Sequence, residues 1–147
     1  LLSKQARITK YDQAALLIGE GYCNNMLMTT TDRKIRLKSI EATWGKALRL
    51  SKGTPLEKHA LWMLGATMMT STTTHLDALP YIAEFIRKYP SDVNVNSAYL
   101  SLAIINLSQN KIEDAVKIYR NLKGKNSESP QVKALERVFK LENIKTN

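Results

Sequence analysis

The sequence predicts an all-α protein in which about seven helices form antiparallel hairpins stacked one after another. Three observations lead to this prediction. Apolar residues recur at helical spacing along nearly the whole chain, and no stretch shows the sustained alternation that is typical of strands. Only six glycines and four prolines occur in 147 residues. The prolines also fall where helices are expected to begin or end, which is where helices tolerate them.

Residues 4–51 are expected to form the first hairpin, with helices over about 4–28 and 33–51. The first helix carries an apolar stripe that we expect to face the core, formed by Ile8, Tyr11, Ala15, Ile18, Tyr22 and Met26. Cys23 lies in this stretch, and a free cysteine in such a place is typical of an inert core thiol. Because it is the only cysteine, no internal disulfide is expected.

The second helix has better-defined ends than the first. Thr29–Asp32 reads as the turn before it, because threonine and aspartate oxygens accept hydrogen bonds from the free amides of a helix start. Lys52-Gly53 is expected to close it, since glycine readily adopts the left-handed conformation found at helix ends. Its predicted core stripe consists of Leu37, Ile40, Trp44, Ala47 and Leu48.

Residues 55–89 are predicted to form the second hairpin. Residues 54–57, Thr-Pro-Leu-Glu, give the clearest local signal in the chain: a threonine cap, a proline at the first helical position, and a glutamate that can bond back to the cap. The helix that follows is expected to end at Thr70–Thr74, a run that favours a loop. Pro80 belongs in a first turn, which places the start of the next helix near Asp77.

The third hairpin is expected over residues 92–123, with the turn Ser108–Asn110 between its helices. Ser129 and Pro130 then start a terminal helix over 130–143, with serine as the N-cap and proline at the first helical position. The apolar residues of this last helix that we expect to face inward are Val132, Leu135, Val138 and Leu141.

Residues 55–90 carry a spaced set of large and small residues, and a weaker copy follows over residues 96–127. The first set consists of Leu61, Leu64, Gly65, Met68, Ala78, Ile82, Phe85 and Pro90. The second consists of Tyr99, Leu102, Ala103, Ala115, Tyr119 and Leu122. Both sets resemble the signature of the tetratricopeptide repeat, a helical hairpin whose small residues lie where its two helices cross closely.

The resemblance implies a short right-handed solenoid that forms one domain over residues 1–147, with the terminal helix covering its open end. The expected units start at Pro55, Asp92 and Pro130, slightly further apart than the usual repeat of about 34 residues. The first hairpin follows the signature least well, although Ile18-Gly19 stands at a suitable place. An irregular all-helical bundle is the alternative fold.

Hydrophobic residues make up 44% of the chain and the mean hydropathy is −0.29, which is typical of a globular protein rather than a disordered one. No transmembrane segment is expected, because the longest apolar runs are far shorter than the roughly 20 residues that span a bilayer. The chain opens with neither a methionine nor a signal-like segment. A cytoplasmic protein and an exported protein with its signal removed are both compatible with this start.

The net charge of +9 is carried by the two ends of the chain, residues 1–58 and 111–147, whereas the middle is nearly neutral. The basic side chains form two helical stripes: Lys34, Lys38, Arg49 and Lys52 in the second helix, and Lys133, Arg137 and Lys140 in the last. No aromatic residue interleaves with either stripe, which favours solvated faces over a nucleic-acid site. Acidic proteins, nucleic acid and anionic lipid headgroups stay open as partners of the stripes.

No combination of residues predicts catalysis. His59 and His75 lack cysteines or carboxylates at the spacing of a metal site. The sequence contains no nucleophile elbow, phosphate-binding loop or dinucleotide fingerprint. We therefore expect no enzyme activity, no catalytic residue, no bound metal and no cofactor.

In tetratricopeptide proteins, ligands lie along the concave face made by the first helix of each hairpin, so the resemblance implies a groove there. Its candidate residues are Gln13, Leu16, Glu20 and Asn24 in the first hairpin, His59, Trp62, Ala66 and Met69 in the second, and Ser97, Leu100, Ile104 and Ser108 in the third. Trp62 is the candidate anchor for a peptide or a partner helix, because aromatic anchors dominate many interfaces. Packing of Trp62 against a neighbouring hairpin is the alternative.

The function predicted from these features is a non-catalytic protein–protein interaction module, a scaffold or adaptor within an assembly. It would bind a peptide or partner helix in the groove, while the peripheral positive charge steers an acidic partner. Self-association and membership of a longer solenoid are also open. The alternative is a basic helical domain that binds RNA or DNA through the two stripes, with an affinity that falls steeply as salt rises.

Overall fold

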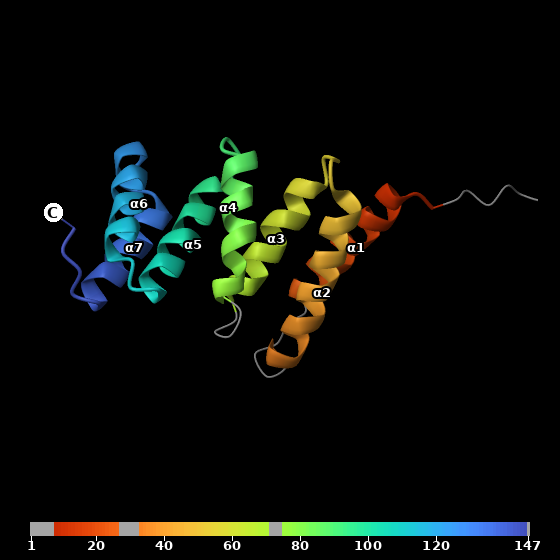
Figure 1. The fold of residues 1–147 in the computed structure, drawn as a ribbon, viewed down its shortest axis with the longest axis horizontal. Coiled ribbons are helices and arrows are strands. Elements are labelled where there is room, and N and C mark those ends of the chain that lie inside the picture. The colour runs from red at the N-terminus through yellow and green to blue at the C-terminus, as the bar shows by residue number, and fades with distance from the viewer. Residues whose placement is uncertain (1–7, 27–32, 71–74, 147) are drawn as a thin grey trace, which may run out of the picture. The chain divides into compact units, whose positions relative to one another are not determined.

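The computed structural model describes residues 8–26, 33–70 and 75–146, apart from the side chains of residues 24–26 and 33–36. Within these ranges the chain forms seven α-helices and one short 3-10 helix, and it contains no strand (Figure 1). The predicted all-α class is therefore confirmed. The expected turn at Thr29–Asp32 and most of the loop at Thr70–Thr74 lie outside the described residues.

The chain divides into two compact units, Leu1–Ser71 and Thr72–Asn147, which we call the N-terminal unit and the C-terminal unit. The division falls inside residues 55–89, the predicted second hairpin, so one helix of that hairpin belongs to each unit. The pairing of these two helices and the single domain over residues 1–147 stay predictions.

The N-terminal unit contains α1 (Lys10–Met26), α2 (Arg33–Ser51) and α3 (Glu57–Met69). Helix α2 packs against both α1 and α3. Its predicted stripe forms the centre of the unit: Leu37, Ile40, Trp44 and Ala47 are buried, and Leu48 is half-buried. This element was predicted at the right place and with the right inward face.

Helix α1 begins later than predicted and turns a different face inward. Thr9 and Asp12 form a reciprocal cap, in which the Thr9 amide donates to the Asp12 carboxylate (2.9 Å) and the Asp12 amide donates to the Thr9 hydroxyl (3.1 Å). The buried residues of α1 are Ala14, Ile18 and Gly21. Of the predicted stripe, Ile18 is buried as expected, and the side chain of Met26 lies outside the described residues. Ile8, Tyr11, Ala15 and Tyr22 are exposed, as is Cys23, so the prediction is wrong for these four residues and for the core thiol.

The contact between Gly21 and Trp44 explains this register. A Cβ atom built on Gly21 would lie 2.6 Å from the Trp44 indole, so only a glycine lets α1 approach α2 this closely. Tyr22 then packs edge-on against the same ring, with 5.3 Å between ring centroids. Gly19, which fits the repeat signature, has nothing within 4 Å of its would-be Cβ. Gly21 is therefore the glycine that sets the helix crossing.

The connection from α2 to α3 keeps part of the predicted chemistry. Helix α3 begins at Glu57 with Leu56 at the N-cap position, so the prediction of Thr54 as the N-cap and Pro55 as the first helical residue is wrong. Gly53 has a φ of 78°, the left-handed conformation expected at a helix end. The Glu57 carboxylate reaches back as predicted, but it accepts from the Gly53 amide (2.9 Å) rather than from that of Thr54. The Thr54 hydroxyl accepts from the Leu56 amide (3.2 Å). Glutamate and threonine thus satisfy two amides of this turn.

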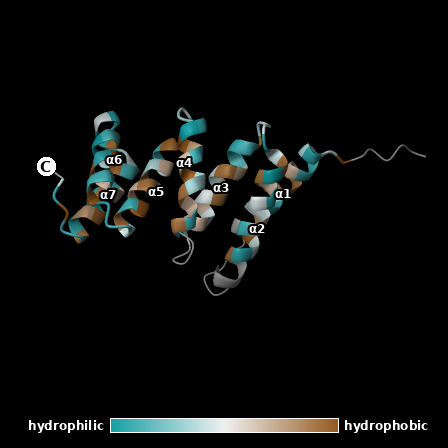
Figure 2. Cartoon of the chain, viewed as in Figure 1, coloured by the Kyte–Doolittle hydropathy of each residue, from teal (hydrophilic) through white to brown (hydrophobic). Residues whose placement is uncertain are grey.

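The C-terminal unit contains a 3-10 helix, η1 (His75–Ala78), followed by α4 (Leu79–Lys88), α5 (Val95–Ser108), α6 (Ile112–Lys125) and α7 (Pro130–Leu141). Consecutive helices pack on one another from α4 to α7, and α5 also contacts α7. Hydrophobic residues predominate in α5, whereas α6 is largely hydrophilic on its outer turns (Figure 2). The core around α6 consists of Ala103, Ala115, Val116, Tyr119, Leu122, Val132, Leu135 and Phe139.

Helix α7 was predicted with the correct start but with one wrong inward residue. The Ser129 hydroxyl accepts from the Val132 amide at 3.3 Å, and Pro130 is the first helical residue. Leu141, predicted to face inward, is 80% exposed, and Phe139 is buried in its place. Leu141 stands in the last turn, where the chain leaves the core, so helical spacing alone places it wrongly.

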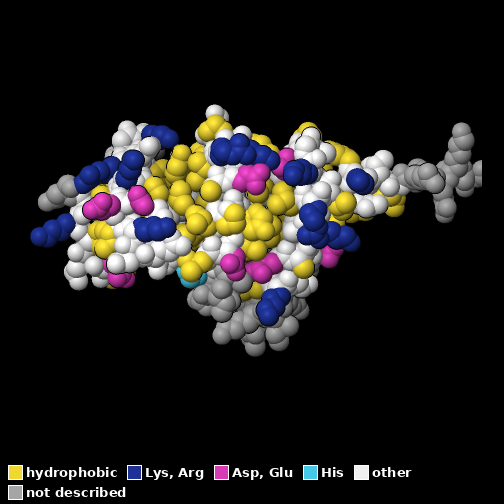
Figure 3. Space-filling model, viewed as in Figure 1, with side chains coloured by type: hydrophobic (Ala, Val, Ile, Leu, Met, Phe, Trp, Pro, Cys, Tyr) yellow, Lys and Arg dark blue, Asp and Glu magenta, His cyan; other side chains and the backbone are white. Residues whose placement is uncertain are grey.

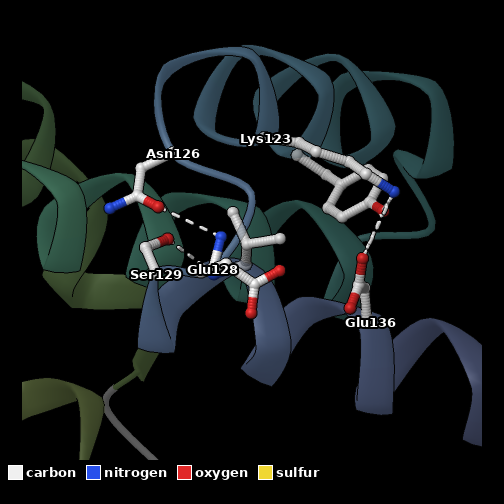
Figure 4. Close-up of polar contacts among 7 residues, drawn as sticks. Lys123, Asn126, Glu128, Ser129 and Glu136 are labelled. Carbon is white, nitrogen blue, oxygen red and sulfur yellow. Dashed lines mark hydrogen bonds and ion pairs between the residues drawn. The ribbon is translucent and has the colours of Figure 1, made fainter.

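A polar cluster joins the outer side of α6 to α7 (Figure 4). The Tyr119 hydroxyl donates to the Glu136 carboxylate at 2.8 Å, and Lys123 Nζ donates to the Tyr119 oxygen at 2.8 Å. Lys123 and Glu136 also form an ion pair at 3.3 Å. These hydrogen bonds lower the pKa of Glu136 and raise the pKa of Lys123, with the bond to Tyr119 the largest cause in both. The cluster thus fixes how α7 lies on α6.

Candidate binding pocket in the C-terminal unit

A pocket of about 490 Å³ opens where α5 and α7 end. Its walls are apolar, and they are formed by Ile104, Leu107, Ile112, Val138 and Ile144. Its polar lining groups are Ser108, Asn110 and Glu142, all of which are exposed. The volume falls within the range of roughly 300–1,000 Å³ that is usual for ligand pockets in proteins.

Two matching helix ends build this pocket. Asn110 and Asn143 follow α5 and α7 in the left-handed conformation, with φ values of 59° and 53°. In each case the next amide bonds back into the helix: that of Lys111 donates to the Asn106 carbonyl and that of Ile144 to the Phe139 carbonyl, both at 2.8 Å. These bonds define the Schellman motif.

Each turn has a different consequence for the pocket. After α5, the turn sends the chain directly into α6, so that Ile112 forms a wall of the pocket. After α7, the turn folds the chain back so that Ile144 packs on the core and lines the opposite side. Because α6 runs back between them, α5 and α7 point in the same direction and their ends meet at one site.

The outward face of α5 continues from the pocket toward the start of the helix. Leu100 is half-buried and Ile104 is 37% exposed, and Ser97 and Ser108 lie on the same side of the helix. Gln131 Nε2 in α7 donates to Ser97 Oγ at 3.2 Å, so α7 borders this face at its far end as well. Figure 3 shows hydrophobic side chains gathered over α4 and α5 of this unit, whereas lysines and arginines are concentrated over α6 and α7.

Charged residues of both signs flank the pocket in the chain. Glu142 is the one charged residue among the lining residues, and it is exposed. Lys111 stands between the lining residues Asn110 and Ile112, and Lys145 follows Ile144, whereas Glu113 and Asp114 follow Ile112. All four of these flanking side chains are exposed. The pocket therefore offers an apolar interior bordered by both positive and negative side chains.

The residues predicted for a groove divide between the two units. In the N-terminal unit, Gln13, Leu16, Glu20 and His59 are exposed and Trp62, Ala66 and Met69 are half-buried, while the side chain of Asn24 lies outside the described residues. In the C-terminal unit, Ser97 and Leu100 are half-buried and Ile104 and Ser108 are exposed. Of these residues, the pocket includes Ile104 and Ser108. A continuous groove that includes both sets stays a prediction.

The predicted basic stripes are at the surface wherever their side chains are described. Lys38, Arg49 and Lys52 are exposed on and just after α2, and the side chain of Lys34 lies outside the described residues. Lys133, Arg137 and Lys140 are exposed on α7, where Lys133 forms an ion pair with Glu128 at 2.9 Å. These exposed positions are compatible with solvated faces and with a site for an anionic partner.

Most of the pocket walls were not recognised in the sequence. Val138 was expected in the core, and Leu107, Ile112 and Ile144 were not singled out. The signal that could have found them is the asparagine at position 110 and again at 143, because asparagine is the residue other than glycine that often ends helices in the left-handed conformation. Two such ends on parallel helices predict that the residues around them meet.

The described part of the chain contains no group of three or more histidine, cysteine, aspartate or glutamate side chains that could hold a metal ion. None of its helices is long and apolar enough to cross a membrane. Comparisons with known protein families, with curated proteins and with solved structures find no match.

Proposed function

We propose that this chain is a non-catalytic protein-interaction module built from tetratricopeptide-like hairpins, and that its α5–α7 pocket binds an apolar side chain of a partner helix or peptide. The observation that carries the proposal is the pocket itself, an open apolar cavity of about 490 Å³ continuous with the half-exposed face of α5. Grooves of this kind hold amphipathic helices through apolar anchors spaced one turn apart.

The burial of the signature residues supports the tetratricopeptide-like part of the proposal. The small residues Gly65, Ala78, Ala103 and Ala115 are all buried. The large residues of the same sets that are buried are Leu61, Leu64, Ile82, Phe85, Tyr119 and Leu122. Successive antiparallel packing of α4, α5, α6 and α7, with α5 against α7, is the neighbour pattern expected of stacked hairpins.

The chemistry of the pocket supports binding rather than reaction. Glu142 is its one titratable lining residue, and it is exposed to solvent at the mouth. General acid–base or nucleophilic catalysis needs a second group within hydrogen-bond distance of the first. The hydroxyl of Ser108 is instead engaged locally, because it donates to the Ile105 carbonyl at 2.8 Å.

The test is a selection of helical peptides from a displayed library, followed by affinity measurements with the purified chain. Peptides with a large apolar anchor are expected to be enriched. Ile104→Asp places a charge in the pocket and is expected to weaken their binding at least tenfold. Val93→Asp is the matched control, because Val93 is 92% exposed and precedes α5 at the end opposite the pocket. Equal affinities for the two variants would contradict the proposal.

Trp62 was predicted to bind a partner in the groove, and this role can be tested separately from binding in the α5–α7 pocket. Trp62 is half-buried in α3, beside the buried Leu61. If Trp62 contributes to the groove, Trp62→Ala weakens peptide binding while the circular dichroism spectrum and the unfolding midpoint are retained. Unfolding of this variant would instead assign Trp62 to packing and limit the proposed site to the α5–α7 pocket.

Nucleic-acid binding is the second candidate, favoured by the exposed stripe of Lys133, Arg137 and Lys140 on α7. Fluorescence-anisotropy titrations of mixed-sequence RNA and DNA at two salt concentrations test it. Submicromolar binding that weakens steeply with salt, and that is reduced by Arg137→Glu, would place this function first. Absence of binding at low salt would remove it and leave the charge as a means of steering an acidic protein partner.

A further inference from the structure

Glu142 is the one charged residue that lines the α5–α7 pocket, and it stands where its own helix disfavours a negative charge. It directly follows the last residue of α7, at the C-cap position. The C-terminal end of a helix carries a negative partial charge, so a lysine or arginine is favoured there and a glutamate is not. None of the ion pairs found among the described residues includes Glu142. The stability of α7 therefore does not explain this charge.

The other charges near the pocket are explained by the helix ends beside them. Glu113 and Asp114 lie in the first turn of α6, where the positive end of the helix favours acidic residues. Lys111 stands between the end of α5, which favours a cation, and the start of α6. Lys145 follows the end of α7, which also favours a cation. Glu142 is the exception, and of these five residues it is the one that lines the pocket.

The polar lining of the pocket offers mainly hydrogen-bond acceptors. The ionised carboxylate of Glu142 accepts hydrogen bonds and cannot donate them. The Ser108 hydroxyl uses its one proton to donate to the Ile105 carbonyl at 2.8 Å, so its oxygen can only accept from a ligand. Asn110, the third polar lining residue, has an amide that can do both. A group that fills the pocket is therefore bound best if it brings donors beside its apolar part.

We infer that the partner of the α5–α7 pocket carries a lysine or arginine within one helical turn of its apolar anchor, and that this cation pairs with Glu142. Lysine and arginine side chains donate hydrogen bonds and accept none, and their charge complements both the carboxylate and the negative end of α7. The inference rests on the proposed function, because it specifies the chemistry of the peptide or helix that the pocket binds. This local preference is opposite in sign to the acidic partner that the net charge of +9 favours.

The test selects peptides from the displayed helical library on the unchanged chain, on Glu142→Lys and on Glu128→Lys. Glu128 is the matched control, because it is an exposed glutamate beside the opposite end of α7. On the unchanged chain, the peptides whose binding is lost with Ile104→Asp are expected to carry lysine or arginine three or four positions from the anchor. Glu142→Lys is expected to select aspartate or glutamate at these positions, whereas Glu128→Lys is expected to keep the basic preference.

Glu142→Gln separates binding from helix stability. It is expected to weaken a selected basic peptide by up to about fivefold, the contribution of an exposed ion pair. The same peptide with its basic residue replaced by glutamine is expected to bind both proteins equally, which completes a double-mutant cycle. The midpoint of urea unfolding is expected to rise slightly, because a disfavoured charge is removed from the end of α7. A lower midpoint would assign Glu142 to the stability of the helix end and overturn the inference.

The selections also distinguish this inference from the proposed function. Anchor peptides without a charge preference, a preference for acidic residues, or the same preference on the unchanged chain and on Glu142→Lys would each overturn the inference and leave the proposed function intact. If no selected peptide depends on Ile104, the proposed function fails, and the inference fails with it.

Discussion

The two units of this chain fix the positions of their helices in different ways. In the N-terminal unit, one close contact between Gly21 and the Trp44 indole determines which face of α1 meets α2. In the C-terminal unit, the positions follow from several features acting together: alanines at the crossings, a serine cap, two asparagine helix ends and the cluster around Tyr119. A single steric fit can be lost by one substitution, whereas a distributed arrangement loses only part of its stability at a time.

The difference also bears on function. In the C-terminal unit, the paired asparagine ends leave the apolar pocket open between the ends of α5 and α7. The proposed binding pocket is therefore a direct consequence of how this unit fixes its helices.

The largest effect is expected in the core of the C-terminal unit. Phe139→Ala removes a ring that is buried between α6 and α7 and packs against Tyr119, with 5.3 Å between ring centroids. Large-to-small substitutions of this type cost about 3–5 kcal/mol. Denaturant unfolding followed by circular dichroism gives the total loss, and hydrogen exchange should show it first in the peptides of α5 to α7.

Leu141→Ala is the matched control, since Leu141 is also apolar and lies two residues further along α7 but is 80% exposed. Its expected effect is within about 0.5 kcal/mol, the usual range for surface substitutions. Similar losses for the two variants would show that Leu141 is buried as the sequence pattern predicts, and that the C-terminal core is assigned wrongly.

The next effect concerns the steric fit of the N-terminal unit. Gly21→Ala places a Cβ atom 2.6 Å from the Trp44 ring, so α1 must move away from α2. Overpacking of this kind costs about 1–3 kcal/mol. Tryptophan emission is the natural measurement, because Trp44 and Trp62 are the only tryptophans of the chain and both belong to the N-terminal unit.

Gly19→Ala, two residues before Gly21, is expected to change the stability of the chain in the opposite direction. A Cβ on Gly19 meets nothing within 4 Å, and alanine in a helix is more favourable than glycine by about 0.5–1 kcal/mol. This variant should therefore be slightly stabilised. If instead Gly19→Ala destabilises the chain and Gly21→Ala does not, the helix crossing uses the glycine that fits the repeat signature.

Much of the fold could be predicted from the sequence because its signals are local. The stripe of α2, the Ser129–Pro130 start and the left-handed Gly53 each depend on residues a few positions apart. The register of α1 could not be predicted in the same way. Gly19 and Gly21 are both small enough for a close crossing, and only the position of Trp44 on a different helix decides between them.

The candidate site was predicted less completely than the fold, for a related reason. Ile104 was predicted because the tetratricopeptide resemblance implies that it lies on the groove face of the first helix of its hairpin. Ile144 lies beyond the last helix, and its place in the pocket depends on the left-handed turn at Asn143. The spacing of residues within a helix predicts which of them share a face. A pocket formed by helix ends depends instead on the direction of the turns, which only the three-dimensional structure gives.

A smaller effect is expected at the start of α7. Ser129→Ala removes the hydroxyl that accepts from the Val132 amide and leaves that amide without its partner. Loss of such a cap costs about 0.5–2 kcal/mol. Ser127→Ala, at an exposed position in the same connection, should be nearly neutral. The difference between the urea midpoints of these two variants measures how much the Ser129 cap contributes to the stability of the C-terminal unit. Equal midpoints would show that the cap does not contribute.

The smallest effect is a pH dependence of the cluster between α6 and α7. The pKa of Glu136 is lowered in the folded chain by its bonds to Tyr119 and Lys123, so its contribution is present above the ordinary glutamate value of about 4.3 and is lost as the pH falls through the lower, folded value. The pKa of Lys123 is raised, so its contribution is lost only when the pH rises through that higher value.

Glu136→Gln keeps an oxygen that can accept from Tyr119 but removes the charge. The unchanged chain is therefore expected to lose more stability than this variant on acidification from about pH 7 to about pH 3, the range in which glutamates take up protons. Because the Glu136 side chain is 44% exposed, the difference should be small and should shrink as salt screens the pair. Parallel acid profiles for the two proteins would show that the cluster orients α7 through hydrogen bonds alone, without a contribution from charge.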